Sequence, residues 1–337
     1  MLTAAWTICR NTFTESIRQP FYMILVTVGV MLMVFAMMWN LYSLSDNTQM
    51  HITTALGGVL LVGLVLASLI ASGVLSREID NKTVLTVISK PIGRPVFVLG
   101  KYLGVAGAVG LAVWIWSMVF LLTVRHKVVF AASDDLDMPV IVFGSMALFI
   151  AVAVSVWGNY FYNWVFTAMF IRIFAVGITL AYLIVLMVNK DWQFQSILTE
   201  FDAQMTPLTN YGEREKSLLQ VVIALLLVLE AIWVLAALAV AVSTRLGQVM
   251  TLIICGGVYA LGLMSDWLFG RFADANVAAD VAYRIVPNLQ VFFLADALML
   301  NSSADASYVL TISGYALLWI VALLAIGVVM FQTRETG

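Results

Sequence analysis

Side chains of the kinds that catalyse reactions or bind metal ions are scarce in this sequence. His51 and His126 are its two histidines, and neither lies in an HExxH motif. No GxSxG motif occurs, so neither a zinc hydrolase nor a Ser-His nucleophile is indicated. Cys9 and Cys255 lie far apart and form no CxxC pair. We therefore expect that the chain is not an enzyme by itself and binds no metal or cofactor.

The nearest approach to a nucleotide-binding motif is the stretch from Gly93 to Lys101. Six residues separate Gly93 from Gly100, and Tyr102 stands where a P-loop has Ser or Thr. Any ATP chemistry is therefore expected on another chain. Five methionines crowd the region 20–43, and we interpret them as apolar filler rather than a copper site: Met23, Met31, Met33, Met37 and Met38.

The elements that would position any site are membrane-spanning helices. The chain has 337 residues, of which 63% are hydrophobic and 11% charged, and its mean hydropathy is +1.01. Soluble domains are nearer half apolar and a quarter charged. Stretches of roughly 20 apolar residues span a bilayer as helices. The sequence predicts an all-α bundle of about eight spans: Pro20–Ser43, Thr54–Leu75, Phe97–Val124, Pro139–Gly158, Trp164–Val188, Leu218–Val242, Val249–Ser265 and Tyr308–Phe331.

The distribution of basic residues predicts the orientation. With the N-terminus in the cytoplasm, bases outnumber acids in the cytoplasmic segments, while acids outnumber bases in the outer loops. An even number of spans then places both termini in the cytoplasm, in the inner membrane of a cell. The cytoplasmic bases in this arrangement are Arg10, Arg18, Arg77, Lys82, Lys90, Arg94, Lys101, Arg245 and Arg334.

Residues 1–19 are predicted to form an amphipathic helix in the plane of the interface, ahead of a transmembrane domain over 20–337. Apolar residues recur in it at helical spacing. The alternative is a cytoplasmic extension of the first span, against which Pro20 argues, because helices usually end before a proline. Within the transmembrane domain, residues 139–188 form a tight hairpin, and residues 266–307 form a partly apolar outer segment broken by Pro287. We expect that outer segment to be re-entrant or interfacial.

The cytoplasmic loop 76–96 carries a short apolar stripe among charges. Asp80 or Asn81 can cap a short helix there, and Pro91 would end it. Its stripe either docks on a partner or rests on the membrane, and the residues alone leave both open. The stripe consists of Val84, Leu85, Val87 and Ile88.

Two ionisable residues fall inside predicted spans. Arg172 and Glu230 would lie about 13 and 18 Å from the cytoplasmic side at 1.5 Å per residue. A charge at mid-bilayer is costly, so we expect the two to pair. We interpret the pair as a brace for the hairpin, and a role in transport is the alternative. Gly100 and Gly104 are spaced for close helix packing, either within the chain or between two copies, and we favour the former.

The loop resembles the signature loop of type-2 ABC exporter permeases, and most closely the multicopper-enzyme-maturation branch, which includes the nitrous-oxide-reductase maturation permease. The residues that carry the resemblance are Arg77 to Thr83, Leu85-Thr86, Ser89-Lys90-Pro91, Arg94 and Gly100-Lys101, with support from Ser243 to Gln248 and Val286 to Leu289.

The resemblance implies a membrane permease subunit whose coupling helix, near Lys82–Ser89, docks into a separate ABC ATPase subunit that holds ATP and Mg. A second permease, identical or different, would complete the unit, with the lipid bilayer around it and no nucleic acid. Residues 139–188 depart from the six-span family core. The implied coupling residues are Glu78, Asp80, Lys82, Thr83, Val84, Leu85, Val87, Ile88, Lys90 and Arg94. The alternatives are an ATP-independent secondary transporter and a membrane scaffold without transport activity.

Overall fold

The computed structural model describes residues 2–39, 47–80, 93–126, 136–195, 218–273, 276–295 and 304–332. Within these ranges the chain is helical apart from short turns and one isolated bridge between Val188 and Phe194, and it has no strand. The prediction of an all-α, multi-pass bundle is therefore confirmed. Its elements are α1 Leu2–Arg18, α2 Pro20–Trp39, α3 Asn47–Asp80, α5 Arg94–His126, α6 Met138–Tyr162, α7 Phe166–Met187, α9 Leu218–Ser243, α10 Gln248–Leu263, α11 Ser265–Leu268, η2 Gly270–Phe272, α12 Val277–Ile285, η3 Gln290–Phe292 and α14 Ala306–Gln332.

Seven of the described helices are long and apolar enough to cross a membrane. The remaining predicted span, Val249–Ser265, corresponds to α10, which has 16 residues and is about 24 Å long at 1.5 Å per residue. That length is short of the roughly 30 Å of a hydrocarbon core. The chain continues beyond α10 through Ser265–Phe272 after a bend of 68°. The predicted count of eight thus holds when this bent pair is counted as one span.

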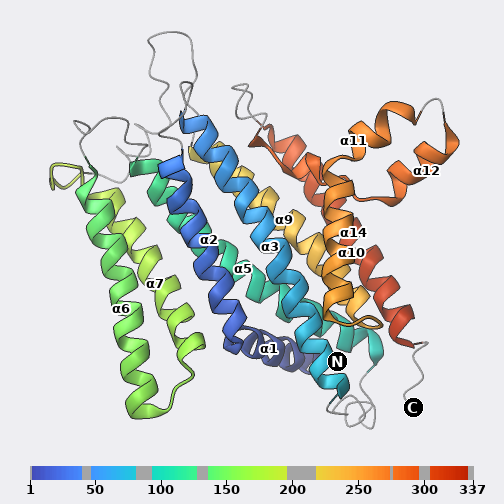
Figure 1. The fold of residues 1–337 in the computed structure, drawn as a ribbon, viewed down its shortest axis with the longest axis horizontal. Helices are drawn as coiled ribbons and strands as arrows, with labels where there is room; N and C mark the ends of the chain where they lie inside the picture. Colours follow the sequence, from blue (N-terminus) through green and yellow to red (C-terminus); the bar gives the residue numbers. More distant parts are fainter. Residues whose placement is uncertain are drawn as a thin grey trace.

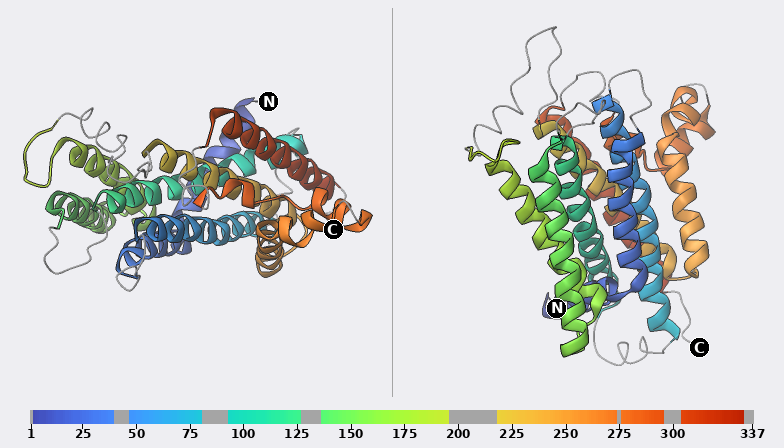
Figure 2. Two further views of the ribbon diagram at one scale, coloured as in Figure 1. Left: turned by 90° about the horizontal axis from the view of Figure 1, so that it is seen from above. Right: turned by 60° about the vertical axis from the view of Figure 1, so that its left-hand side comes forward.

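The spans stand side by side, and α1 lies across them at one end of the bundle (Figure 1). We call this end the α1 side and the other the opposite side. The α6–α7 hairpin stands at one edge of the molecule, whereas α11 and α12 project at the other edge (Figures 1 and 2). The turn between α6 and α7, the turn between α9 and α10, and the end of α14 all lie on the α1 side (Figure 1).

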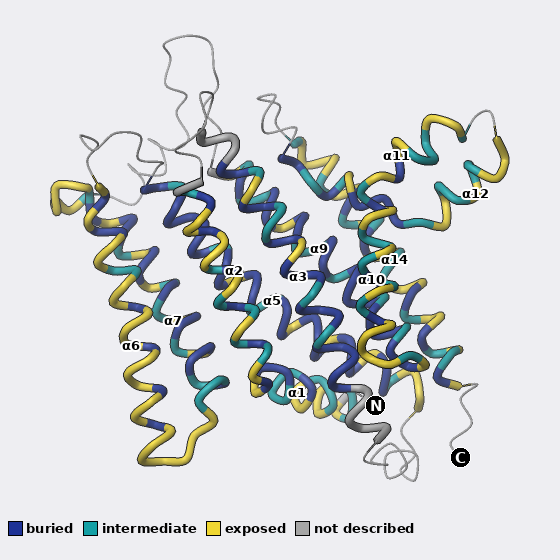
Figure 3. The backbone as a smooth tube through the Cα atoms, in the orientation of Figure 1, coloured by how far each residue is buried: buried dark blue, intermediate teal, exposed yellow. Residues whose placement is uncertain are grey.

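Burial divides the helices into a central group and a lipid-facing periphery (Figure 3). In the apolar 18-residue stretch of α5, 72% of the residues are buried, compared with 22% in that of α6. α5 packs against α1, α2, α3, α7 and α9, and it is therefore the hub of the bundle. Because α6 is apolar almost all round and little buried, lipid is the natural solvent for its outer face.

The boundary between α1 and α2 falls where the sequence predicts it. α1 ends at Arg18 and α2 begins at Pro20, a first-turn position where the missing N–H of proline does no harm. The α6–α7 turn is equally tight. Asn163 adopts a left-handed conformation with φ 53°, and the Asn159 side chain donates a hydrogen bond of 2.7 Å to the carbonyl of Trp164. The predicted hairpin is therefore two antiparallel helices in direct contact.

Candidate functional site

The end of α3 and the start of α5 both lie on the α1 side, and the residues for which coupling is predicted lie at or between these two ends. α3 continues as a helix beyond its apolar part, His51–Val74, to Asp80. Six further residues extend it by about 9 Å. Glu78 and Asp80 lie in this extension, so Asp80 ends α3. The other predicted coupling residues of the loop lie outside the described residues: Lys82, Thr83, Val84, Leu85, Val87, Ile88 and Lys90.

Arg94 is the predicted coupling residue whose side chain the structure places. It begins α5, and its Nη1 donates a hydrogen bond of 2.8 Å to the carbonyl of Gln332 at the end of α14. Arg245, in the α9–α10 turn, donates in the same way to Met330 over 2.8 Å. Cations stabilise the last carbonyls of a helix. Two arginines therefore fasten the end of α14 to the start of α5 and to the α9–α10 turn.

Gly100 and Gly104 bring α1 and α5 into backbone contact. A β-carbon on Gly100 would lie 2.9 Å from Cβ of Ile8, and one on Gly104 would lie 2.5 Å from Cβ of Thr12. It would also lie 2.7 Å from the backbone oxygen of Cys9. The two glycines thus serve packing within the chain, as we favoured. Because neither residue has a side chain, α1 packs directly against the first turns of α5.

Three aromatic side chains reinforce the hub by hydrogen bonds to backbone carbonyls. Tyr22 donates to Ala108 over 2.7 Å, and the indole of Trp233 donates to Ala106 over 3.1 Å. Trp116, on α5 itself, donates to Val26 over 2.9 Å. Buried tyrosine and tryptophan need such a partner for their polar atom. These contacts are not predictable from the sequence, because nothing in the spacing of the residues indicates which carbonyls they reach.

Arg172 and Glu230 are not paired, so the predicted intramembrane ion pair is wrong for this structure. Arg172 is exposed on α7, while Oε1 of Glu230 accepts a hydrogen bond of 2.7 Å from Oγ of Ser313 on α14. α5 packs against both α7 and α9, which are not substantially in contact with each other.

The geometry of helices explains the error. Arg172 lies six residues after the start of α7, about 9 Å along the axis, whereas Glu230 lies about 20 Å from the end of α9. Helical side chains lean toward their own N-terminus. Because α7 and α9 run in opposite directions, Arg172 leans toward the α1 side and Glu230 leans away from it. A long arginine side chain can then reach the interface without a carboxylate.

A different pair braces the hairpin. Nε of Arg125, at the end of α5, lies 3.3 Å from Oδ2 of Asp137, and both side chains are at least 94% buried. The other carboxylate oxygen of Asp137, Oδ1, accepts a hydrogen bond from the backbone N–H of Val140 and so caps α6. The Arg125 guanidinium donates to the carbonyl oxygens of Val185 and Val188 at the end of α7. One buried arginine thus joins α5 to both helices of the hairpin, on the opposite side from the α6–α7 turn.

The predicted outer segment folds back onto the bundle. After α12, the backbone N–H of Leu289 donates to the carbonyl of Gly262 over 3.0 Å, and that of Asn288 donates to the Tyr315 hydroxyl over 2.8 Å. Leu289 and Phe292 are buried. The hydroxyl of Tyr283 donates to Asp266 over 2.7 Å, and this bond raises the pKa of Tyr283. These contacts hold the described part of the segment, residues 266–273 and 276–295, against the bundle. Its depth in a membrane stays a prediction.

Comparison with protein-family models and with curated proteins found no match for this chain. Among the described residues, no group of three His, Cys, Asp or Glu side chains is placed to hold a metal ion. The assignment of function therefore depends on the sequence motifs and on the packing of the α1 side.

Proposed function

We propose that this chain is the membrane-spanning permease subunit of an ATP-binding-cassette exporter. A separate ATPase subunit binds and hydrolyses ATP with Mg, and a second permease subunit completes the transport unit. The protein lies in the cytoplasmic membrane with both termini inside, so the α1 side faces the cytoplasm. Hydrolysis by the partner moves a substrate across the membrane or out of it.

The observation that supports this proposal most is the close packing of α1 on α5 beside the α3–α5 connection. A push on the residues between Asp80 and Arg94 would act on α3 and α5, whose extended ends project toward it. The glycine contacts would pass that movement to α1, and the hydrogen bond from Arg94 would pass it to α14. Coupling needs a rigid set of elements of this kind next to the ATPase docking site.

One observation favours the secondary transporter. Glu230 lies near the middle of α9, and its Oε2 is buried and has no hydrogen-bond partner among the described residues. Ionisable groups at such depth often carry protons or coordinate ions in transporters. That function would depend on an ion gradient and not on ATP. The scaffold alternative has no structural observation of its own.

Isolation of the affinity-tagged full-length chain from its native membranes tests the proposal. We expect a co-purifying subunit that contains GxxxxGK[ST], and ATP hydrolysis by the complex that stops when that Lys is replaced. Recovery of the chain without such a subunit, from membranes solubilised in several mild detergents, would contradict the proposal. Substrate movement driven by an imposed proton gradient without ATP would identify the secondary transporter instead.

A further inference from the structure

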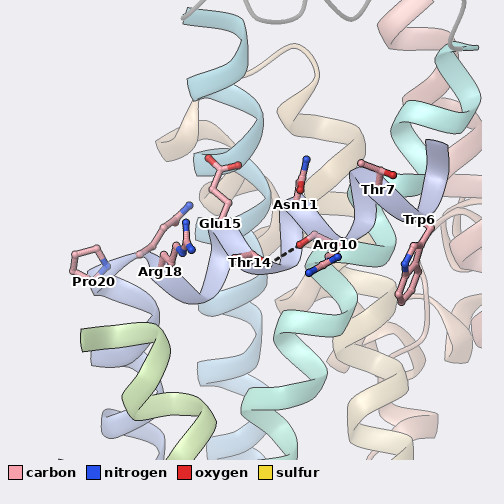
Figure 4. Close-up of a pocket in the computed structure, with 9 residues that line it drawn as sticks. Trp6, Thr7, Arg10, Asn11, Thr14, Glu15, Arg18 and Pro20 are labelled. Atoms are coloured by element: carbon pink, nitrogen blue, oxygen red, sulfur yellow. Dashed lines mark hydrogen bonds between the residues drawn. The ribbon is translucent and has the colours of Figure 1, made fainter. Parts of the chain in front are cut away.

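A cavity of about 610 Å³ runs along the outward face of α1. Residues of α1 and of the elbow that leads into α2 line it (Figure 4). It lies where an in-plane helix meets the ends of the spanning helices, which is the level of the lipid headgroups. Nothing in the proposed coupling mechanism uses it.

The charge of this groove is positive. Arg10 and Arg18 line it eight residues apart, about 12 Å along the helix, and both are exposed. Within the part of the chain that the structure describes, no carboxylate lies within ion-pair distance of either guanidinium. Glu15, the acidic residue of the lining, already has an interaction partner. The two arginines are therefore available to an anion.

The elbow places a buried amide beneath the groove. Gln19 is 2% exposed, and its Oε1 lies next to Gly73 of α3. Among the residues that the structure describes, neither its Nε2 nor its Oε1 has a hydrogen-bond partner. A buried amide without partners costs about 1–3 kcal/mol. At the other end of the groove stands Trp6, 68% exposed, a residue type that favours the membrane–water interface.

An apolar stripe on α2 continues from the groove. Pro20 lines the groove, and Ile24, Val28 and Met31 follow it at helical spacing, all of them exposed. An acyl chain lying along this stripe would place its own headgroup beside Arg18. A phospholipid matches both features, because its headgroup can contact the arginines while its acyl chain contacts the stripe. A free anion would contact the arginines alone.

We propose that the α1 groove binds the phosphate-bearing headgroup of an anionic phospholipid from the leaflet on the α1 side. Arg10 and Arg18 bind the phosphate oxygens, and the acyl chain lies along α2. The bound lipid fixes the position of α1 along the membrane normal, and α1 is the helix that packs on α5 at Gly100 and Gly104. This site is independent of whether the chain works with an ATPase.

Native mass spectrometry of the delipidated full-length protein tests the proposal with two probes, dioleoyl phosphatidylglycerol and dioleoyl phosphatidylcholine. We expect tight binding of phosphatidylglycerol and a loss of about 30-fold in its affinity in Arg10→Gln/Arg18→Gln, since each arginine contributes about 1 kcal/mol. The matched control is Arg271→Gln/Arg284→Gln on the opposite side, which should retain the wild-type affinity.

Two further arms complete the test. Arg10→Lys/Arg18→Lys keeps both charges and should retain most of the binding, which separates loss of charge from misfolding of α1. Inorganic phosphate at millimolar concentration should not displace phosphatidylglycerol. Equal affinity for both lipids, unchanged binding in the glutamine variant, or full displacement by phosphate would each overturn the proposal.

Discussion

Gly104 of α5 lies so close to Thr12 of α1 that a β-carbon on the glycine would stand 2.5 Å from Cβ of Thr12. The backbone oxygen of Cys9, at 2.7 Å, cannot move aside like a flexible side chain. Gly104→Ala should therefore force α1 away from α5. We expect a loss of about 1–3 kcal/mol, typical of overpacking, measured as a lower melting temperature in detergent.

Gly144→Ala is the matched control for this prediction. Gly144 lies within α6, and a β-carbon added to it would have nothing within 4 Å. Alanine has the higher helix propensity, by up to about 1 kcal/mol, so this variant should be neutral or more stable. If Gly104→Ala were as stable as the wild-type protein, α1 would not pack on α5 as described.

The buried pair of Arg125 and Asp137 yields a prediction about the hairpin. Arg125→Gln leaves the carboxylate of Asp137, which is 1% exposed, without its cation. Breaking such a pair from one side costs about 3–5 kcal/mol, so the folded yield in detergent should fall sharply. Arg125→Gln/Asp137→Asn should recover part of it, because asparagine caps a helix as well as aspartate does.

The pair of Arg284 and Asp280 is the control, because it is exposed and joins residues four apart on α12. Arg284→Gln should change stability by no more than about 0.5 kcal/mol. If Arg125→Gln is as mild as Arg284→Gln, Arg125 does not brace the hairpin.

The sequence predicts the spans well because hydropathy and helix length are local properties of the chain. Pro20 and the turn near Asn163 mark helix ends by rules that involve only neighbouring residues. Pairings between helices do not follow from such rules. The sequence gives Arg172 and Glu230 similar depths in the membrane, and on that basis alone they could pair. The structure keeps them apart because α5 packs against both α7 and α9. The role of Arg125 escapes sequence analysis for the same reason, since it sits at a predicted boundary and its partners are carbonyls at the end of α7.

The hairpin should cross the membrane twice, and cysteine labelling can establish this. In a Cys9→Ser/Cys255→Ser background, Phe194→Cys and Tyr160→Cys place thiols at opposite ends of the hairpin, where the native side chains are 87% and 79% exposed. An impermeant maleimide added to intact cells should label position 194 and should label position 160 only after permeabilisation. Labelling of both from outside would mean a re-entrant hairpin, and the reverse pattern would mean an inverted orientation.

The coupling loop should carry the contact with the ATPase. Leu85→Asp or Ile88→Asp puts a charge on its predicted apolar stripe and should abolish co-purification of the ATPase subunit, while membrane insertion is unchanged. Val281→Asp is the control, because Val281 is an exposed apolar residue of α12 on the opposite side. If both loop variants retain the ATPase, the stripe is not the docking site.

The hydrogen bond between Ser313 and Glu230 leads to a final prediction, on the two ionisable residues within the spans. Because Arg172 and Glu230 are not in contact, the effects of Arg172→Leu and Glu230→Leu on the free energy of unfolding should add within about 0.5 kcal/mol. Glu230→Leu and Ser313→Ala remove the two partners of one hydrogen bond, so their double variant should depart from additivity by about 0.5–3 kcal/mol. Glu230→Gln keeps the acceptor oxygen for Ser313 and should be close to neutral. These values come from thermal or denaturant unfolding of the purified variants in one detergent. A strong coupling between positions 172 and 230, with none between 230 and 313, would restore the ion pair and contradict the packing of α9 against α14.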